Sequence, residues 1–166
     1  MHHPHFVSSV AFSNDGTRIV SGSGDSRVRI WNATTGEMER VLEGHSGWVR
    51  SVSFSSDGTR VVSSSHDSSV PIWDTNIGEI QRILNGHSGH VRFVALSQDG
   101  TCVASGSYDN SVRIWNANTG EIDSLLEGHS DHVISVASHD GTRIVSGAGQ
   151  GTVTVCYVAT GGRSGL

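Results

Sequence analysis

Short runs of alternating apolar and small polar residues recur along the chain, and the clearest is VRSVSFS at residues 49–55. A period of two is typical of a half-buried β-strand, whose successive side chains point to opposite faces of a sheet. The following Asp57-Gly58-Thr59 predicts a hairpin turn. Similar runs and turns continue to residue 85. The stretch therefore predicts four antiparallel strands over residues 49–55, 60–65, 70–74 and 79–85.

This unit occurs about four times, because its landmark residues recur every 41 or 42 positions. The turn pairs are Asp15-Gly16, Asp57-Gly58, Asp99-Gly100 and Asp140-Gly141. The spaced histidines and tryptophans are His3, His45, His87, His129, Trp31, Trp73 and Trp115. Self-similarity at a fixed period is the signature of a repeat architecture. The predicted copies span residues 2–43, 44–85, 86–127 and 128–166 of a single domain, 1–166.

A twisted four-stranded sheet with apolar residues on both faces must pack on both faces. Stacking the copies face to face around an axis achieves this. The expected fold class is therefore all-β, a β-propeller with four four-stranded antiparallel blades per chain, the last of them incomplete. The 21 glycines and 2 prolines suit many short strands joined by tight turns.

Charge and composition exclude several classes of partner. The net charge is −5 and no lysine- or arginine-rich run occurs, so we expect no nucleic-acid partner. No apolar run approaches the ~18 residues of a membrane span, and the first residues lack a signal-peptide pattern, so we expect no membrane partner. Cys102 and Cys156 fit neither a disulfide framework nor a zinc site. We therefore expect a cytoplasmic protein, with the nucleus as the alternative.

The landmarks resemble those of the WD-repeat (WD40) family, with Gly44-His45 near the start of a unit and Trp73-Asp74 near its end. Trp31-Asn32 and Trp115-Asn116 are near variants of the Trp-Asp pair. The similarity between copies resembles the recently amplified WD-repeat arrays of fungal and bacterial sensor proteins. The resemblance implies a propeller that binds protein partners.

The first three copies carry a histidine, a serine, an aspartate and a tryptophan at matching positions. These sets are His3, Ser21, Asp25 and Trp31; His45, Ser63, Asp67 and Trp73; and His87, Ser105, Asp109 and Trp115. One interpretation is a hydrolase triad. The other is a buried hydrogen-bond network linking all four side chains, which is what the family resemblance implies. A triad has no reason to occur three times, so we favour the network and expect neither enzymatic activity nor a cofactor.

Copy four departs from the pattern. Gln150 stands at the aspartate position and Cys156 at the tryptophan position, and only GGRSGL remains from Gly161 onwards. We expect this blade to be the least ordered and to lack a full outer strand, which leaves its third strand as an exposed edge. In copy two, Pro71 replaces an arginine, and we expect a missing ladder hydrogen bond there.

The number of blades leaves three assemblies open. Two chains pair into an eight-bladed ring with two-fold symmetry; or four blades close alone, at about 90° between neighbours instead of about 45°; or the array stays open as part of a longer one. Small serine and glycine side chains argue against so wide a wedge. Open ends expose an apolar face, so we favour the homodimer, in which each chain is a half-ring.

A partner-binding face is expected where the first strands begin and where the turns between second and third strands lie, as in WD-repeat proteins. The corresponding residues are Phe6, Ser8, Gly24, Trp48, Arg50, His66, His90, Arg92, Tyr108, His132, Ile134 and Gly149. The middle copies supply the residue types enriched at interaction hot spots. Trp48 is the strongest candidate, with simple covering of the blade as the alternative.

Two metal alternatives arise from histidines. His2, His3 and His5 follow the N-terminal amine in a pattern that chelates Cu²⁺ or Ni²⁺, but His3 is in register with His45, which favours a structural role. His90 and His132 occupy one position in adjacent copies and suggest a pH-sensitive or metal-binding pair. We favour neither metal site.

The sequence therefore predicts a non-enzymatic scaffold that binds a protein or peptide partner, as half of a two-chain propeller. The alternative is the sensor or ligand-recognition segment of a larger STAND/NLR-like WD-repeat protein. The family's ubiquitin-ligase adaptor role depends on an arginine two residues after the Trp-Asp pair. Thr34, Asn76 and Asn118 stand at those positions, so that role is not supported.

Overall fold

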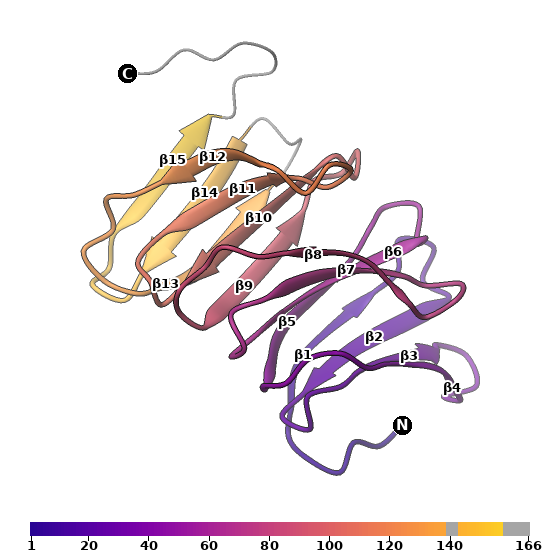
Figure 1. Ribbon diagram of the computed structural model, residues 1–166. Coiled ribbons are helices and arrows are strands. Elements are labelled where there is room, and N and C mark those ends of the chain that lie inside the picture. Colours follow the sequence, from indigo (N-terminus) through magenta and orange to yellow (C-terminus); the bar gives the residue numbers. More distant parts are fainter. Residues whose placement is uncertain (139–142, 158–166) are drawn as a thin grey trace.

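The computed structural model describes residues 1–138 and 143–157, which form strands only, in four antiparallel sheets (Figure 1). Blade one contains β1 (Val7–Phe12), β2 (Arg18–Ser23), β3 (Val28–Asn32) and β4 (Met38–Leu42). Blade two contains β5 (Val49–Phe54), β6 (Arg60–Ser65), β7 (Val70–Asp74) and β8 (Ile80–Leu84). Blade three contains β9 (Val91–Leu96), β10 (Cys102–Ser107), β11 (Val112–Asn116) and β12 (Ile122–Leu126). Blade four contains β13 (Val133–Ser138), β14 (Arg143–Ala148) and β15 (Val153–Tyr157).

The predicted fold class is confirmed. Each of the first three sheets has its strands in chain order, and the described part of the fourth has three strands, so this blade is incomplete within those residues. In the described part of the chain, no helix is long and apolar enough to cross a membrane.

The Asp-Gly pairs turn the chain between the first and second strands of a blade. Gly58 has a φ of 68°, in the left-handed region that glycine adopts without steric cost. The Asp57 carboxylate accepts hydrogen bonds from the Thr59 backbone N–H at 3.0 Å and from the Ser55 hydroxyl at 2.5 Å. These local bonds explain why the turn positions were predictable from sequence.

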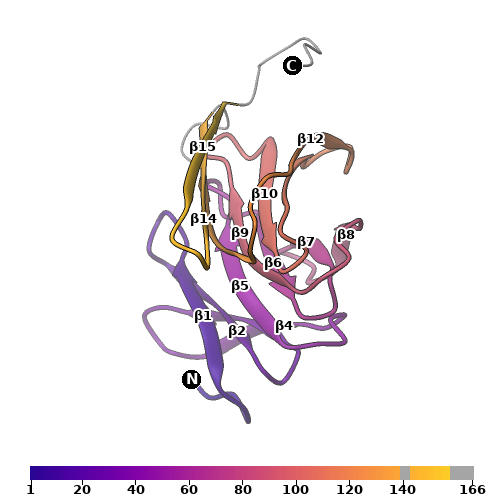
Figure 2. The same cartoon turned by 90° about the vertical axis from the view of Figure 1, so that its left-hand side faces the viewer.

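Successive blades stack through their first strands, which form the inner row of the arc (Figure 2). β1 packs on β5, β5 on β9 and β9 on β13, and the second strand of each blade also contacts the first strand of the next. Valines and isoleucines fill the interfaces between blades. The first interface joins Val20, Val28 and Ile30 to Val49, Val52 and Phe54.

The four blades form an open arc. The close strand contacts join each blade to its neighbours in sequence, and none joins blade four to blade one within residues 1–138 and 143–157. Both views show the first and last sheets at opposite ends of the stack (Figures 1 and 2). The alternative in which four blades close a ring alone is therefore wrong for this structure, because the first and last blades do not meet.

Both predicted irregularities are seen in the described residues. Pairing between β6 and β7 ends at Val62 and Ile72, whereas the matching ladder of blade one continues for two further pairs. The prediction of a disturbed ladder beside Pro71 is thus confirmed. In blade four, β15 is the edge of the described sheet, as predicted. The Asp140-Gly141 turn and the chain from Gly161 lie outside the described residues.

Candidate functional site

In blades two and three, the four predicted side chains meet in one buried chain of hydrogen bonds. His87 contacts the Asp109 carboxylate through Nδ1 at 2.8 Å and the Ser105 hydroxyl through Nε2 at 2.7 Å. The Trp115 indole N–H donates to the same hydroxyl at 2.8 Å. Blade two repeats this arrangement, with His45 joined to Asp67 and Ser63 and Trp73 joined to Ser63, each at 2.8 Å.

The donors and acceptors determine the histidine tautomer. Because the ionised carboxylate of Asp109 can only accept hydrogen bonds, Nδ1 of His87 must carry the proton. Ser105 Oγ accepts from the indole and donates its own proton to Nε2. With His87 neutral, each hydrogen-bond donor and acceptor in the network therefore has a partner. The network joins the turn after β10 to the second and third strands of the blade.

This geometry is unsuited to nucleophilic catalysis. The Ser63 and Ser105 residues are fully buried, and each hydroxyl is already occupied by an indole and an imidazole. A nucleophile needs space for a substrate carbonyl and donors for the developing oxyanion. Neither serine has that space, so the histidine–serine–aspartate resemblance to a hydrolase triad is superficial.

Asp109 and His87 both have shifted pKa values. Burial opposes ionisation of Asp109, but hydrogen bonds from Ser111 and His87 outweigh it and lower the pKa of this carboxyl to about 2. Burial also lowers the pKa of His87, against the opposing effect of Asp109. The pKa of Asp67 is likewise held far below its usual range by bonds from His45 and Ser69, which outweigh its burial. The networks thus combine a neutral imidazole with an ionised carboxylate.

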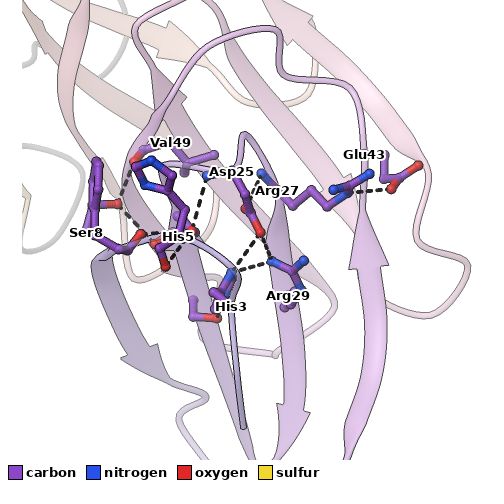
Figure 3. Close-up of polar contacts among 12 residues, drawn as sticks. His3, His5, Ser8, Asp25, Arg27, Arg29, Glu43 and Val49 are labelled. Carbon is purple, nitrogen blue, oxygen red and sulfur yellow. Dashed lines mark hydrogen bonds and ion pairs between the residues drawn. The ribbon is translucent and has the colours of Figure 1, made fainter.

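Blade one differs because Arg29 enters its network (Figure 3). The Arg29 guanidinium donates to Asp25 at 2.7 Å and also contacts Nδ1 of His3, which lies 3.5 Å from the same carboxylate. His3 Nε2 contacts Ser21 Oγ at 2.6 Å, and the Trp31 indole donates to that oxygen at 2.8 Å. The predicted bond from histidine to aspartate is therefore replaced by an arginine bridge, since a guanidinium can donate to both groups.

Blade four keeps only part of the network. His129 Nε2 contacts Ser146 Oγ at 2.8 Å, while its Nδ1 faces the Thr152 hydroxyl at 3.2 Å. Gln150, at the aspartate position, accepts from Ser130 at 3.0 Å instead. The Cys156 side chain lies outside the described residues.

The predicted partner face carries a continuous row of rings across the blades, which we call the ring row: His5, Phe6, Trp48, His66, His90, Tyr108 and His132. Two pairs are stacked, His66 on His90 at 4.1 Å between centroids and Tyr108 on His132 at 4.3 Å. Trp48 stays 43% exposed although Phe6 and His66 contact it. Its indole therefore both covers the blade and remains accessible to a partner.

The ring row links neighbouring blades through one repeated contact. The turn before the aspartate of one blade supplies His66 or Tyr108, and the next blade supplies His90 or His132. Nδ1 of His90 lies 2.5 Å from the His66 carbonyl, and Nδ1 of His132 lies 2.8 Å from the Tyr108 carbonyl. His90 and His132 therefore each stack on a residue of the preceding blade, and Tyr108 lies between them.

The remaining predicted face residues border the ring row or fall outside it. Arg50 donates through Nε to His66 Nε2 at 2.6 Å, and its guanidinium lies 5.4 Å from the Trp48 ring centre. Ile134 is 43% exposed, and Arg92 is half-buried. Ser8 instead donates to the Val49 carbonyl of the next blade at 2.5 Å, so it serves packing between blades (Figure 3).

The structure also contains hydrogen bonds between neighbouring blades that the sequence did not predict. Arg18 donates to the Gly58 carbonyl of the next blade at 2.6 Å, and Arg60 repeats this bond to Gly100 at 2.7 Å. The recurrence of arginine directly after the first turn is the signal that identifies this contact. His5 belongs to the ring row but was assigned only to a metal alternative.

The histidines near the N-terminus are dispersed. His3 lies in the network of blade one, whereas His5 packs on Phe6. Among residues 1–138 and 143–157, no group of three or more histidine, cysteine, aspartate or glutamate side chains is arranged to hold a metal ion.

Comparison with known proteins supports the repeat assignment. A stretch of 46 residues is 44% identical to the nuclear distribution protein nudF 1 of Talaromyces marneffei. Stretches of 46 and 45 residues are 44% and 47% identical to F-box/WD repeat-containing protein 7 of Drosophila melanogaster and to the Notchless protein homolog of Arabidopsis thaliana. Each covers 27–28% of this chain, but only 10%, 3% and 10% of the respective relatives.

The family model for the WD domain, G-beta repeat, matches residues 1–32, 36–74, 78–116 and 120–156. The matches cover nearly the whole chain, and the second and third each contain the outer strand of one blade together with the first three strands of the next. The chain therefore belongs to the WD40 family.

Proposed function

We propose that this chain is a non-enzymatic protein-interaction scaffold whose partner-binding face is the ring row with Arg50, Arg92 and Ile134. WD40 repeat proteins generally act as scaffolds for protein partners. The observation that carries the proposal is the row of exposed and half-buried aromatic and histidine side chains along the blades. Aromatic residues and arginine are enriched at the centres of protein interfaces.

The geometry of the network serines supports the non-enzymatic part of the proposal. The serines of the networks are buried and doubly hydrogen-bonded, so the network has a structural role that joins the strands of each blade. The expected cytoplasmic or nuclear location stays a prediction.

We further propose that two chains close an eight-bladed ring, because each end of the arc exposes a face that is buried elsewhere in the same chain. Val7, Val10 and Phe12 of β1 are 48%, 65% and 66% exposed. Their counterparts in blade two, Val49, Val52 and Phe54, are 0%, 5% and 9% exposed, because they pack on blade one. The face of β1 thus has the composition of a surface that receives a preceding blade.

The opposite end has the matching surface. Val145, Val153 and Val155 of blade four are 40%, 71% and 53% exposed. Val20, Val28 and Ile30, at the same positions of blade one, are completely buried under the next blade. Joining blade four of one chain to blade one of a second copy would therefore repeat an interface that each chain already forms three times.

The sequence also repeats, at this junction, the arginine that makes polar contacts between blades. Arg18 and Arg60 each donate to the carbonyl of the turn glycine in the next blade. Arg143 occupies the same position in blade four. In the two-chain ring, the corresponding acceptor is the Gly16 carbonyl of the second copy.

The alternative is the sensor segment of a larger STAND/NLR-like WD-repeat protein, in which further repeats cover the same two end faces. Both proposals use the same packing surfaces. They differ in whether this chain alone dimerises.

Light scattering and sedimentation over a range of concentrations test the two-chain ring. We expect twice the 17.6 kDa of a single chain, and a shift to monomer in the variants Phe12→Asp and Val153→Asp. Ile77→Asp is the control, because Ile77 is 64% exposed in a turn outside the end faces. A mass of one chain at all concentrations would reject the ring.

Quantitative affinity capture tests the partner face. A specific partner should bind the wild-type chain and the Ile77→Ala variant, and should be lost with Trp48→Ala. Trp48 is accessible, so its truncation should leave the melting temperature nearly unchanged. Equal capture by Trp48→Ala and wild type would contradict the assignment of this face.

A further inference from the structure

One segment of the ring row joins an arginine to a histidine that must be neutral. Arg50 Nε donates to His66 Nε2 at 2.6 Å. Arginine has no acceptor and keeps its proton, so Nε2 of His66 must present a lone pair. His66 is therefore neutral, with its proton on Nδ1.

The rings around His66 hold this arrangement in place. His66 lies between Trp48, at 5.2 Å, and His90, on which it stacks at 4.1 Å. The Arg50 guanidinium lies over the Trp48 ring at 5.4 Å, a distance at which a cation is attracted to the aromatic face. The histidine thus holds the arginine over the ring of Trp48, the most strongly favoured residue of the proposed partner face.

The charged side chains that act on the His66 imidazole are basic. Arg50 and Arg92 carry positive charges, and His90 and Tyr108 are the other titratable groups along the row. The neighbouring Asp67 carboxylate is already used by His45 and by the Ser46 and Ser69 N–H groups. Burial, with the charges of Arg50, His90 and Arg92, lowers the pKa of His66 below its ordinary value.

We propose that His66 is a proton-operated latch that controls the availability of the Arg50 guanidinium on the partner face. When a solvent proton binds Nε2, the lone pair that accepts from Arg50 is lost and the hydrogen bond breaks. The imidazolium then repels the guanidinium, which leaves the Trp48 ring. The freed fork of N–H donors suits a carboxylate group of a protein partner.

Among the described contacts, the arginine–histidine bond occurs at the junction of blades two and three, and the next junction has Tyr108 at the position of His66. Tyr108 and His132 stack at 4.3 Å, and His132 also bonds the Tyr108 carbonyl. At this junction Arg92 stands at the position of Arg50, and His132 stands at the position of His90. The hydrogen bond of His132 goes to a backbone carbonyl and not to an arginine, so His132 serves as an internal control for histidine protonation in the row.

The idea that the released Arg50 meets a partner rests on the proposed partner face. The protonation of His66 and the movement of Arg50 can be tested without a partner. The pH titration of each histidine is followed by NMR with labelled imidazole carbons, between about pH 4.5 and 8. Trp48 is followed by acrylamide quenching, because the other three tryptophans, Trp31, Trp73 and Trp115, are at most 4% exposed. We expect the quenching of Trp48 to increase with the same midpoint as the protonation of His66.

Three variants separate the latch from a general effect of acid. His66→Gln keeps an uncharged side chain with an acceptor, and should abolish the pH-dependent change at Trp48. Arg50→Gln should raise the midpoint of His66, because the adjacent positive charge is gone. His132→Gln should leave both signals as in the wild type.

Two results would overturn the latch: a Trp48 transition that persists in His66→Gln, or a His66 midpoint that is unchanged in Arg50→Gln. Melting temperatures at pH 7.5 confirm that each variant is folded before its titration is interpreted. Failure of the partner-capture experiment with a normal titration would reject the partner face and leave the latch intact.

Discussion

At the scale of single residues, the buried serine is the junction of each network. Ser105 Oγ is the acceptor for the Trp115 indole and the donor to His87, and all three side chains are almost completely buried. Removing a junction leaves two polar atoms without partners in a place that water cannot reach. The networks therefore stabilise the blades chiefly because an incomplete network is so costly.

Ser105→Ala should lower the free energy of unfolding by about 2–3 kcal/mol, because His87 Nε2 and the Trp115 N–H lose their partner in a buried site. Urea denaturation measures this change. Ser88→Ala, on the exposed loop of the same blade, is the control and should have little effect. A similar cost in both variants would show that the network contributes no specific stability.

The same network predicts loss of stability in acid. His87 has a lowered pKa in the folded state, so its contribution is present above the ordinary histidine pKa and declines as the pH falls through the folded value. Asp109, whose pKa is lowered to about 2, contributes above about pH 4 and loses its contribution between about pH 4 and 2.

Melting temperatures measured between pH 7.5 and 2.5 should therefore decrease in two stages. In Asp109→Asn, the stage below pH 4 should be smaller, because the amide does not titrate. A melting temperature that is constant or rises on acidification would contradict the assigned protonation states.

At the scale of an element, the turn between the second and third strands requires a left-handed residue. Ser26, Ser68 and Asn110 adopt φ values of 65–69° at equivalent positions, and blade four has Gly151 there with a φ of 80°. Serine pays a steric cost in this conformation that glycine avoids. The repeat thus keeps the backbone of the turn while its side chain varies.

Ser68→Gly should raise the free energy of unfolding by up to about 1 kcal/mol, since relief of the left-handed strain exceeds the entropy that glycine adds to the unfolded chain. Chemical denaturation measures the difference. Ser46→Gly, in a nearby exposed loop without positive φ, should have no stabilising effect. Destabilisation by Ser68→Gly would show that the serine makes a compensating contact.

At the scale of the whole molecule, the close stacking of blades depends on small residues facing the next first strand. A Cβ atom at Gly106 would lie 2.5 Å from the Val133 side chain. Gly147 has the same position in blade four, but there the nearest atom is Ser135 Oγ at 2.8 Å and no further blade follows in the described chain.

Gly106→Ala should therefore destabilise the chain by about 1–3 kcal/mol through overpacking. Gly147→Ala should change the stability of the single chain little. If two chains close a ring, Gly147 faces Val7 of the second copy, and the same substitution should weaken dimerisation. Denaturation and sedimentation of both variants measure the two effects. Wild-type dimerisation in Gly147→Ala would contradict the proposed junction.

The strands, the turns and the repeat were predictable from sequence because they depend on local chemistry. The alternation in residues 49–55 matches β5, and the Asp57-Gly58 turn forms through bonds within a few residues. The histidine, serine, aspartate and tryptophan of each copy could be grouped because identical spacing places them identically in every blade.

Contacts between blades were decided only by the tertiary structure. The stacking of His66 on His90 depends on the rotation and separation of neighbouring sheets. The Arg50–His66 bond and the entry of Arg29 between His3 and Asp25 lie within single blades and depend on how their side chains pack there. Arg29 and Arg113 occupy the same position, yet only Arg29 joins the aspartate, while Arg113 lies against the Trp115 ring. A repeat determines what each blade contains, whereas the neighbours of a side chain depend on how the blades meet.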